Sequence, residues 1–364
     1  MTATADPQSS TASPTRPTRR ARSGGGIWRY ILIRFLLIFP TIFILVSLVF
    51  VFMRVTGDPI TAALGGKLPP DQLQALITEA GYDRPLWQQY FEYIGQIFTG
   101  NFGTTLTGNH EPVIDVLFRY GAATLELAIY ALFVALIVGI PLGMLAAKLR
   151  DRYGDAILRV GAILFYATPV LFLGLVLKLI FSVWLGALPS SGRASPRGAI
   201  ALERVDGATG IYLIDALRSG NPDLVADVLL HAILPGIALG FLTAGIFLRL
   251  VRTNMISTLN ADFVDAARSR GVGEYRLTTV HAFRPALVPI VTVIGLQVAM
   301  LLGGAVLTET TFEWRGLGFQ LAEFLAARDF VAVQGIVALL AVIVALTNFL
   351  VDMVAAIIDP RVRY

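Results

Sequence analysis

Six long apolar segments dominate this sequence and leave it few ways to fold. They cover about 31–53, 122–147, 157–185, 229–251, 287–308 and 331–358. Each is close to or above the ~20 residues that an α-helix needs to cross a bilayer with its backbone polar groups paired internally. With 55% apolar and only 15% charged residues, the chain has the composition of a membrane protein. We therefore expect an all-α polytopic membrane protein with six transmembrane helices.

The segments outside the spans suggest the domain organisation. Residues 1–28 are rich in Ser, Thr, Pro, Gly and Arg, which predicts a disordered basic tail. Its arginines could bind nucleic acid, but beside a span a basic flank that orients the protein is the simpler explanation. Residues 29–364 are expected to form one transmembrane domain, with polar segments at 54–120, 186–228 and 309–330 on one side and a loop at 252–286 on the other.

Charge predicts which side is which. The three polar segments on the first side carry 10 basic and 16 acidic residues, whereas the segments on the opposite side, 1–34, 148–159, 249–286 and 352–364, carry 18 basic and 8 acidic residues. Because basic residues gather on the cytoplasmic side of membrane proteins, both termini and the loop 252–286 are expected in the cytoplasm.

Several kinds of chemistry find no support in the residues. There is no cysteine, and the histidines His110, His231 and His281 lie far apart without a zinc-binding spacing. None of the three lysines completes a GxxxxGK[ST] loop. We expect no metal site and no catalytic site, and any ATP that powers this protein must be hydrolysed by another chain.

The stretch 260–287 predicts a short helix that terminates itself. Asn260 or Asp262 can cap its start, and Gly271 stands where a left-handed C-cap residue is expected. Acidic residues open the helix and basic residues close it, as the helix dipole favours: these are Asp262 and Asp265, then Arg268 and Arg270. The small pair Ala266-Ala267 would let another surface approach closely. This pattern alone is equally compatible with a helix that docks onto a partner protein and with a helix that lies on the membrane surface.

The same stretch resembles the cytoplasmic E-A-A-x-x-x-G loop of ABC-importer permease subunits. Residues 265–271 read DAARSRG and residues 281–285 read HAFRP. Asp265 stands where many relatives have Glu, and Pro285 stands where the dipeptide/oligopeptide/nickel branch often has Asn. More narrowly, the chain resembles the B-type permease of the dipeptide/oligopeptide/nickel branch. The further matches, in order along the chain, are 57–59 (GDP), 81–86 (GYDRPL), 123–127 (ATLEL), 139–143 (GIPLG), 188–193 (LPSSGR), 309–318 (ETTFEWRGLG) and 359–364 (DPRVRY).

This resemblance implies a type I ABC importer permease in the cytoplasmic membrane of a bacterium or archaeon. Its implied partners are a second, C-type permease subunit, two ATPase subunits that bind ATP and Mg²⁺, an extracytoplasmic solute-binding protein and membrane lipid, with no nucleic acid. The permease itself catalyses no reaction and forms half of the translocation path. The residues implied in ATPase coupling are Asp262, Asp265, Ala266, Ala267, Arg268, Gly271, Arg284 and Pro285.

The cargo is less closely defined than the class of transporter. The stretch 209–216 (TGIYLIDA) resembles dipeptide-type members, so we expect peptides, with nickel or a sugar as the alternative within the class. A secondary transporter would need intramembrane charge relays or inverted repeats. Outside the segments counted above, the chain carries two isolated charges, Glu126 and Lys178, and it has no visible repeat. An intramembrane enzyme would lack a His, Cys or Asp site.

Four residues are candidates for the path or its gate. Glu126 and Lys178 lie inside predicted spans, each towards the outer end, so that an ion pair between them is geometrically possible and a structural role is favoured. Trp314 and Arg315 stand beside a Gly turn after the fifth span, which we expect to enter the outer mouth of the path. Trp314 could equally be an aromatic anchor at the membrane interface.

Overall fold

The computed structural model describes residues 27–358 apart from 56 and 109. The predicted basic tail lies outside the described residues except for 27 and 28, which already belong to the first helix. The terminal match at 359–364 also lies outside them. Residues 27–358, with those two gaps, contain no β-strand beyond an isolated bridge between Thr104 and Pro112, so the all-α prediction is confirmed.

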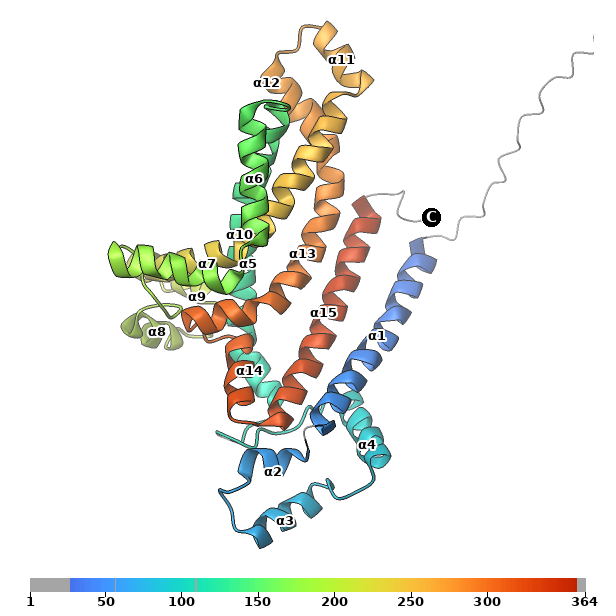
Figure 1. Cartoon of the computed structure of the whole chain (residues 1–364), viewed down its shortest axis with the longest axis vertical. Coiled ribbons are helices and arrows are strands. Elements are labelled where there is room, and N and C mark those ends of the chain that lie inside the picture. Colours follow the sequence, from blue (N-terminus) through green and yellow to red (C-terminus); the bar gives the residue numbers. More distant parts are fainter. Residues whose placement is uncertain (1–26, 56, 109, 359–364) are drawn as a thin grey trace, which may run out of the picture.

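Four helices are long and apolar enough to cross a membrane, and two bent helix pairs bring the number of possible crossings in the described chain to six. The four run along the long axis of the molecule (Figure 1). They are α1 (Ile27–Val55), α5 (Val113–Lys148), α10 (Pro222–Leu259) and α15 (Phe330–Ile358). Each contains a predicted span and extends it at both ends or, in α15, by one residue at the start.

The third predicted span, 157–185, is not one straight helix. It divides into α6 (Tyr153–Ala167) and a second arm made of α7 (Val170–Leu177) and a π-helix (Lys178–Trp184), with a bend of 102° between them. Thr168 is extended, with ψ 124°, because Pro169 disfavours a helical conformation in the residue before it and has no N–H to donate. The second arm therefore leaves the bundle sideways (Figure 1).

The fifth span also departs from its predicted form. The short α12 (Glu274–Arg276) and a π-helix (Leu277–Ala282) lead directly into α13 (Phe283–Phe312). The chain bends by 52° between Glu274–Leu287 and Pro289–Gln297, where Pro289 interrupts the hydrogen-bond ladder. No sharp turn forms around Pro285, which lies within this continuous run of helix, three residues after the π-helix ends.

The core forms where α5 and α10 pack closely together. A Cβ on Gly139 would lie 2.8 Å from the carbonyl oxygen of Ala244, and a Cβ on Gly240 would lie 2.6 Å from that of Ala131. Only glycine permits this separation, as is common between membrane helices. These glycines are therefore packing residues.

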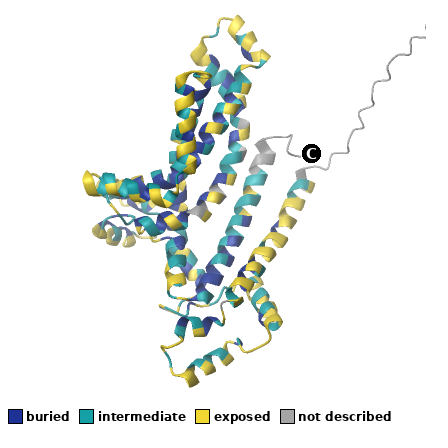
Figure 2. Cartoon of the chain, viewed as in Figure 1, coloured by how far each residue is buried: buried dark blue, intermediate teal, exposed yellow. Residues whose placement is uncertain are grey.

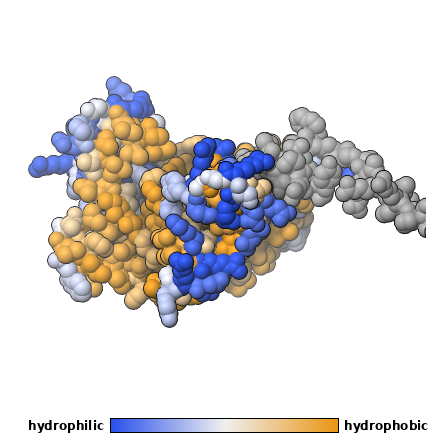
Figure 3. All heavy atoms as spheres, turned by 90° about the horizontal axis from the view of Figure 1, so that it is seen from above, coloured by the Kyte–Doolittle hydropathy of each residue, from blue (hydrophilic) through white to orange (hydrophobic). Residues whose placement is uncertain are grey.

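Short helices cover the two ends of the bundle (Figure 1). At one end lie α2 (Pro59–Leu64), α3 (Pro70–Glu79), α4 (Leu86–Phe98) and α14 (Leu317–Ala326). At the opposite end lies α11 (Asp262–Ser269), and α8 (Pro196–Glu203) and α9 (Tyr212–Arg218) pack against each other and against α10. Much of α1 is exposed (Figure 2), and apolar residues make up much of the surface seen from above, with hydrophilic residues in separate patches (Figure 3).

Candidate functional site

A cavity of about 800 Å³ lies between the start of α5, the loop that carries α8 and α9, and the turn after α13. It is far along the molecule from α11 (Figure 1). Its lining carries both signs of charge: Arg119, Arg193, Arg315, Glu203, Glu313 and His231, with the tyrosines Tyr120 and Tyr212. A space of this size and mixed polarity suits a small polar solute.

A buried ion pair lies beneath the cavity. Arg193 Nη2 is 2.5 Å from Glu126 Oε2, and the two side chains are only 10% and 2% exposed. Arg193 also donates to the carbonyl of Gly210 at 2.7 Å. Glu126 in turn accepts hydrogen bonds from the Tyr130 hydroxyl and the Leu213 N–H, both at 2.9 Å. The loop is thus joined to α5 through charges that water cannot easily reach.

The suggested Glu126–Lys178 pair does not form. Lys178 Nζ donates to the carbonyl oxygen of Thr311 at 2.8 Å and lies 5.6 Å from the ring centre of Phe312. The reason is the break before α7, since the sideways arm takes Lys178 to the end of α13. Arg193 instead occupies the position opposite Glu126, because its loop folds back over α5.

Trp314 is fully buried, so the alternative of an interfacial anchor is wrong. Its Nε1 donates to the carbonyl of Ala123 at 2.8 Å, and its ring meets that of Tyr130 edge to face at 6.2 Å. The guanidinium of Arg193 lies 5.7 Å from the Trp314 ring and 3.7 Å from the Tyr212 ring. Of the four path candidates, Arg315 lines the cavity, Glu126 and Trp314 support it from beneath, and Lys178 lies outside its lining.

The turn after α13 is shaped by a buried carboxylate. Glu309 accepts from the Thr124 hydroxyl at 2.7 Å and from the Phe319 N–H at 2.8 Å. A Cβ on Gly316 would lie 2.6 Å from that carboxylate, so glycine is required there. Glu313 ends α13 in the left-handed region, with φ 51°. This turn is what brings Glu313 and Arg315 to the cavity.

Sequence reasoning missed Arg193, Tyr212 and Glu313 as site residues. Arg193 was within a quoted match, 188–193, and Glu313 within 309–318. Both stand in polar segments where charge is ordinary, so no local signal set them apart. Their roles depend on a loop folding back over α5, which composition does not reveal.

At the opposite end, α11 ends as the sequence predicts but begins differently. Gly271 has φ 79° and donates to the Arg268 carbonyl at 3.0 Å, while the Val272 N–H reaches the Ala267 carbonyl at 3.2 Å. This pair of bonds is the Schellman motif. The expected side-chain cap is absent: Ala261 is the N-cap residue, and Asn260 follows the end of α10.

The predicted coupling residues, which lie on α11, just after it and at the start of α13, differ in exposure. Asp262, Asp265, Ala266, Arg268, Arg284 and Pro285 are exposed, whereas Ala267 is half-buried and packs against the chain's own core beside Val264. Of the pair Ala266 and Ala267, only Ala266 leaves a small exposed surface. Phe263, which the sequence analysis did not single out, is 47% exposed on the same helix.

Arg268 is already engaged within the chain. It lies 2.8 Å from Glu274 and 2.7 Å from Asp265. The hydrogen bond with Glu274 and the neighbouring carboxylate charges raise the pKa of Arg268. Both bridges are exposed, so they contribute little to stability, but they hold the turn around Gly271 against α11.

Comparison with known proteins identifies the family. The family described as "Binding-protein-dependent transport system inner membrane component" matches residues 139–364, and its N-terminal counterpart matches residues 27–136. The dipeptide transport system permease protein DppB of Escherichia coli K12 is 38% identical over 338 residues, which cover 92% of this chain and 99% of that protein. The di/tripeptide permease DppB of Pseudomonas aeruginosa is 38% identical over 330 residues, 90% of this chain and 96% of that protein.

A probable D,D-dipeptide permease of Escherichia coli, DdpB, is 37% identical over 309 residues, 85% of this chain and 89% of that protein. Among solved structures, an inward-facing MetNI methionine ABC transporter is similar in fold, with a TM-score of 0.51 and 16% identity, covering 68% of this chain and 99% of that one. The chain belongs to the family of binding-protein-dependent transport system inner membrane components, and is a multi-pass membrane permease subunit of the ABC-importer class.

Proposed function

We propose that this permease imports small peptides, that it is driven by ATP hydrolysed on two partner ATPase subunits, and that the cavity near α8 and α9 receives the peptide. The proposal places α11 and both termini in the cytoplasm and the cavity on the outer side, in accord with the distribution of charge. A second permease subunit would complete the path, and an extracytoplasmic binding protein would deliver the solute. The relatives named above, which are described as dipeptide or di/tripeptide permeases, support this cargo.

The observation that carries the proposal is the set of charges in the cavity. A free dipeptide bears an ammonium group and a carboxylate a few bonds apart. Arg315, Glu203 and Glu313 all line the cavity, and none forms a salt bridge with another described residue. The Nε of Arg193 is buried without a hydrogen-bond partner in the described chain. The same cavity therefore contains an arginine that can bind the carboxylate of a dipeptide and glutamates that can bind its ammonium group.

The order of the elements along the chain supports the coupling part of the proposal. From α11 the chain passes through Gly271 and α12 into α13, and α13 ends at the turn that brings Glu313 and Arg315 to the cavity. A partner that grips α11 can therefore move the cavity wall through α13 as a rigid body. As for the cargo, a permease that carried nickel or a sugar would not need both positive and negative side chains in the cavity.

Uptake by the assembled transporter in proteoliposomes tests the proposal. We expect ATP-dependent accumulation of a labelled dipeptide, competed by unlabelled dipeptide and poorly by the same dipeptide acetylated at its N-terminus or amidated at its C-terminus. Arg315→Gln should raise the KM for the dipeptide, and Arg197→Gln, on an exposed arginine of α8 that does not line the cavity, should not. ATP-dependent uptake of nickel or a sugar in place of the dipeptide would contradict the cargo.

A further inference from the structure

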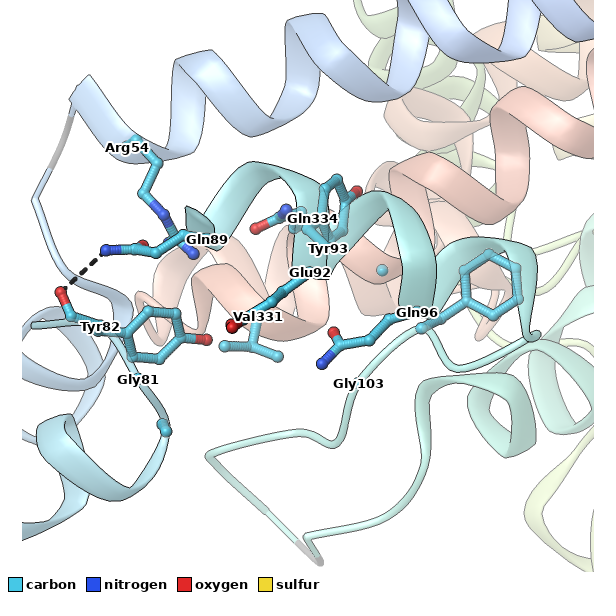
Figure 4. A pocket seen from close by; sticks show the side chains of 13 residues that line it. Arg54, Gly81, Tyr82, Gln89, Glu92, Tyr93, Gln96, Gly103, Val331 and Gln334 are labelled. Carbon is cyan, nitrogen blue, oxygen red and sulfur yellow. Dashed lines mark hydrogen bonds between the residues drawn. The ribbon is translucent and has the colours of Figure 1, made fainter. Parts of the chain in front are cut away.

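A second, smaller cavity lies where the end of α1, the turn before α4, α4 itself and the start of α15 meet (Figure 4). Its volume is about 80 Å³. Arg54, near the end of α1, reaches towards it, and Tyr82, Gln89, Tyr93 and Gln334 contribute polar groups from the other elements. It is separate from the peptide cavity, whose lining shares no residue with it.

The guanidinium of Arg54 has no carboxylate paired with it among the described residues. Its Nε and Nη1 are buried without a hydrogen-bond partner there, and the guanidinium lies 5.0 Å and 4.6 Å from the ring centres of Phe50 and Tyr82. It forms no salt bridge with any described residue. Arg54 is half-buried, and charged donors that are removed from water without a counter-charge are unfavourable, so the cavity is suited to an anionic group.

The acidic residues closest at hand are occupied elsewhere. Glu92 lines the cavity, but its carboxylate is held by Arg84 at 2.6 Å. Asp58, just beyond α1, accepts the N–H of Thr61 at 2.8 Å and caps α2. Both carboxylates have partners of their own and neither forms a salt bridge with Arg54, so the position beside the guanidinium is open to an external anion.

The remaining polar groups define what that anion should look like. Gln89 Nε2 donates to the carbonyls of Tyr82 and Arg84 at 3.0 and 2.7 Å, so that its buried Oε1, which has no partner in the described chain, is left as an acceptor. Burial raises the pKa of Tyr93 to about 12, which keeps this phenol protonated as a donor. A cation and a donor beside a free acceptor suit a phosphate group that carries or adjoins a hydroxyl or an ammonium group.

The position of the cavity at the end of α1 brings it near the phosphate groups of a bilayer. Arg54 is the penultimate residue of α1, and its neighbours Val51, Phe52 and Val55 expose their apolar side chains, as expected of residues at the end of a span. Trp87 and Phe91 are exposed on α4, and aromatic residues are typical of the membrane interface. Phospholipid phosphates lie at this level of a bilayer.

We propose that this cavity is a phosphate-binding site, in which Arg54 pairs with one phosphate group that belongs to a phospholipid headgroup or is free in solution. Bound there, the phosphate would join α1, α4 and α15 through one charge. Neither the site nor its occupant depends on what the permease transports.

Thermal unfolding of the purified transporter in phospholipid-free detergent tests this site at constant ionic strength. One arm adds sodium phosphate in exchange for chloride, and the other adds short-chain, water-soluble phosphatidylglycerol. We expect a saturable rise in Tm with at least one probe: a rise with phosphate identifies a free anion, and a rise with the lipid alone identifies a headgroup. Arg54→Met should abolish the rise, whereas Lys67→Met, on an exposed lysine near the same end, should retain it.

Arg54→Lys keeps the positive charge and provides a second test of the site in case Arg54→Met does not fold. It should bind the same probe more weakly, with a higher half-saturating concentration, because an ammonium group lacks the planar fork of donors. No saturable rise with either probe in the unaltered protein, or an unchanged rise in Arg54→Met or Arg54→Lys, would overturn the proposal.

Discussion

Arg193 and Glu126 form a buried ion pair, 2.5 Å long, between a loop and a membrane helix that are 67 residues apart in the sequence. The pair fixes the loop that carries α8 and α9 onto α5, and it lies beneath the cavity in which we propose that peptides bind. Its partners Tyr130 and Leu213 both donate to Glu126. Because both of these donors point at position 126, the carboxylate must lie on α5 and the cation on the loop, and the two cannot be exchanged.

Glu126→Gln should destabilise the protein by about 3 kcal/mol, because it leaves the Arg193 charge buried without its partner. Exchanging the two residues should fail to restore stability, since an arginine at 126 would face the N–H and O–H donors of Leu213 and Tyr130. Thermal unfolding of the purified transporter measures both effects. Glu92→Gln breaks an exposed ion pair and should cost no more than about 1 kcal/mol; an equal loss in the two single variants would contradict the assignment.

Trp314→Phe should cost about 1–3 kcal/mol, because it removes the hydrogen bond to Ala123 together with part of a fully buried side chain. The same substitution at Trp87, which is exposed on α4, should change the stability by less than about 0.5 kcal/mol. Unfolding of the two variants side by side gives the comparison. A smaller effect at Trp314 than at Trp87 would mean that the turn does not depend on this ring.

Local sequence predicts the helices of this protein better than it predicts where they break. Pro141 and Pro235 lie inside the continuous helices α5 and α10, whereas Pro169 separates α6 from α7. All three stand in apolar runs, so the difference comes from the surroundings: α5 and α10 are held by close packing against each other through glycines. The chain at Pro169 instead turns sideways towards α13.

The candidate site shows the same limit. The short helix α11 and its stop at Gly271 follow from residue types at fixed spacing, and these local features were predictable. The partner of Glu126 was not, because two cations, Lys178 and Arg193, were available and only the fold-back of the loop decides between them. Ala266 and Ala267 look alike in the sequence, yet one is exposed and the other packs inward.

Gly271→Ala should loosen the end of α11, whereas Gly273→Ala should not. Neither new Cβ would meet another atom within 4 Å, but Gly271 has φ 79° and Gly273 has φ −66°. The left-handed conformation costs an alanine about 1 kcal/mol. Hydrogen exchange of the amides of Gly271 and Val272 should accelerate several-fold in the first variant alone; equal protection in both would contradict a role for the C-cap.

Ala267→Trp should destabilise the permease itself, since Ala267 packs beside Val264 against the core and a larger side chain has no room there. Ala266→Trp should leave the permease as stable as the original, because position 266 is exposed. Thermal unfolding of the permease purified without ATPase subunits separates the two cases. A lower Tm for Ala266→Trp would show that its effects on coupling are not confined to the docking surface.

We propose that partner ATPases drive transport through the surface of α11. ATP-dependent dipeptide uptake by Ala266→Trp in proteoliposomes is the measurement that shows whether they do. Ala75→Trp, on an exposed alanine of α3 at the other end of the molecule, is the matched control. We predict that Ala266→Trp inserts into the membrane normally but no longer retains the ATPase subunits or takes up dipeptide, while Ala75→Trp does both. Uptake and ATPase retention by Ala266→Trp at the level of the control would contradict the claim.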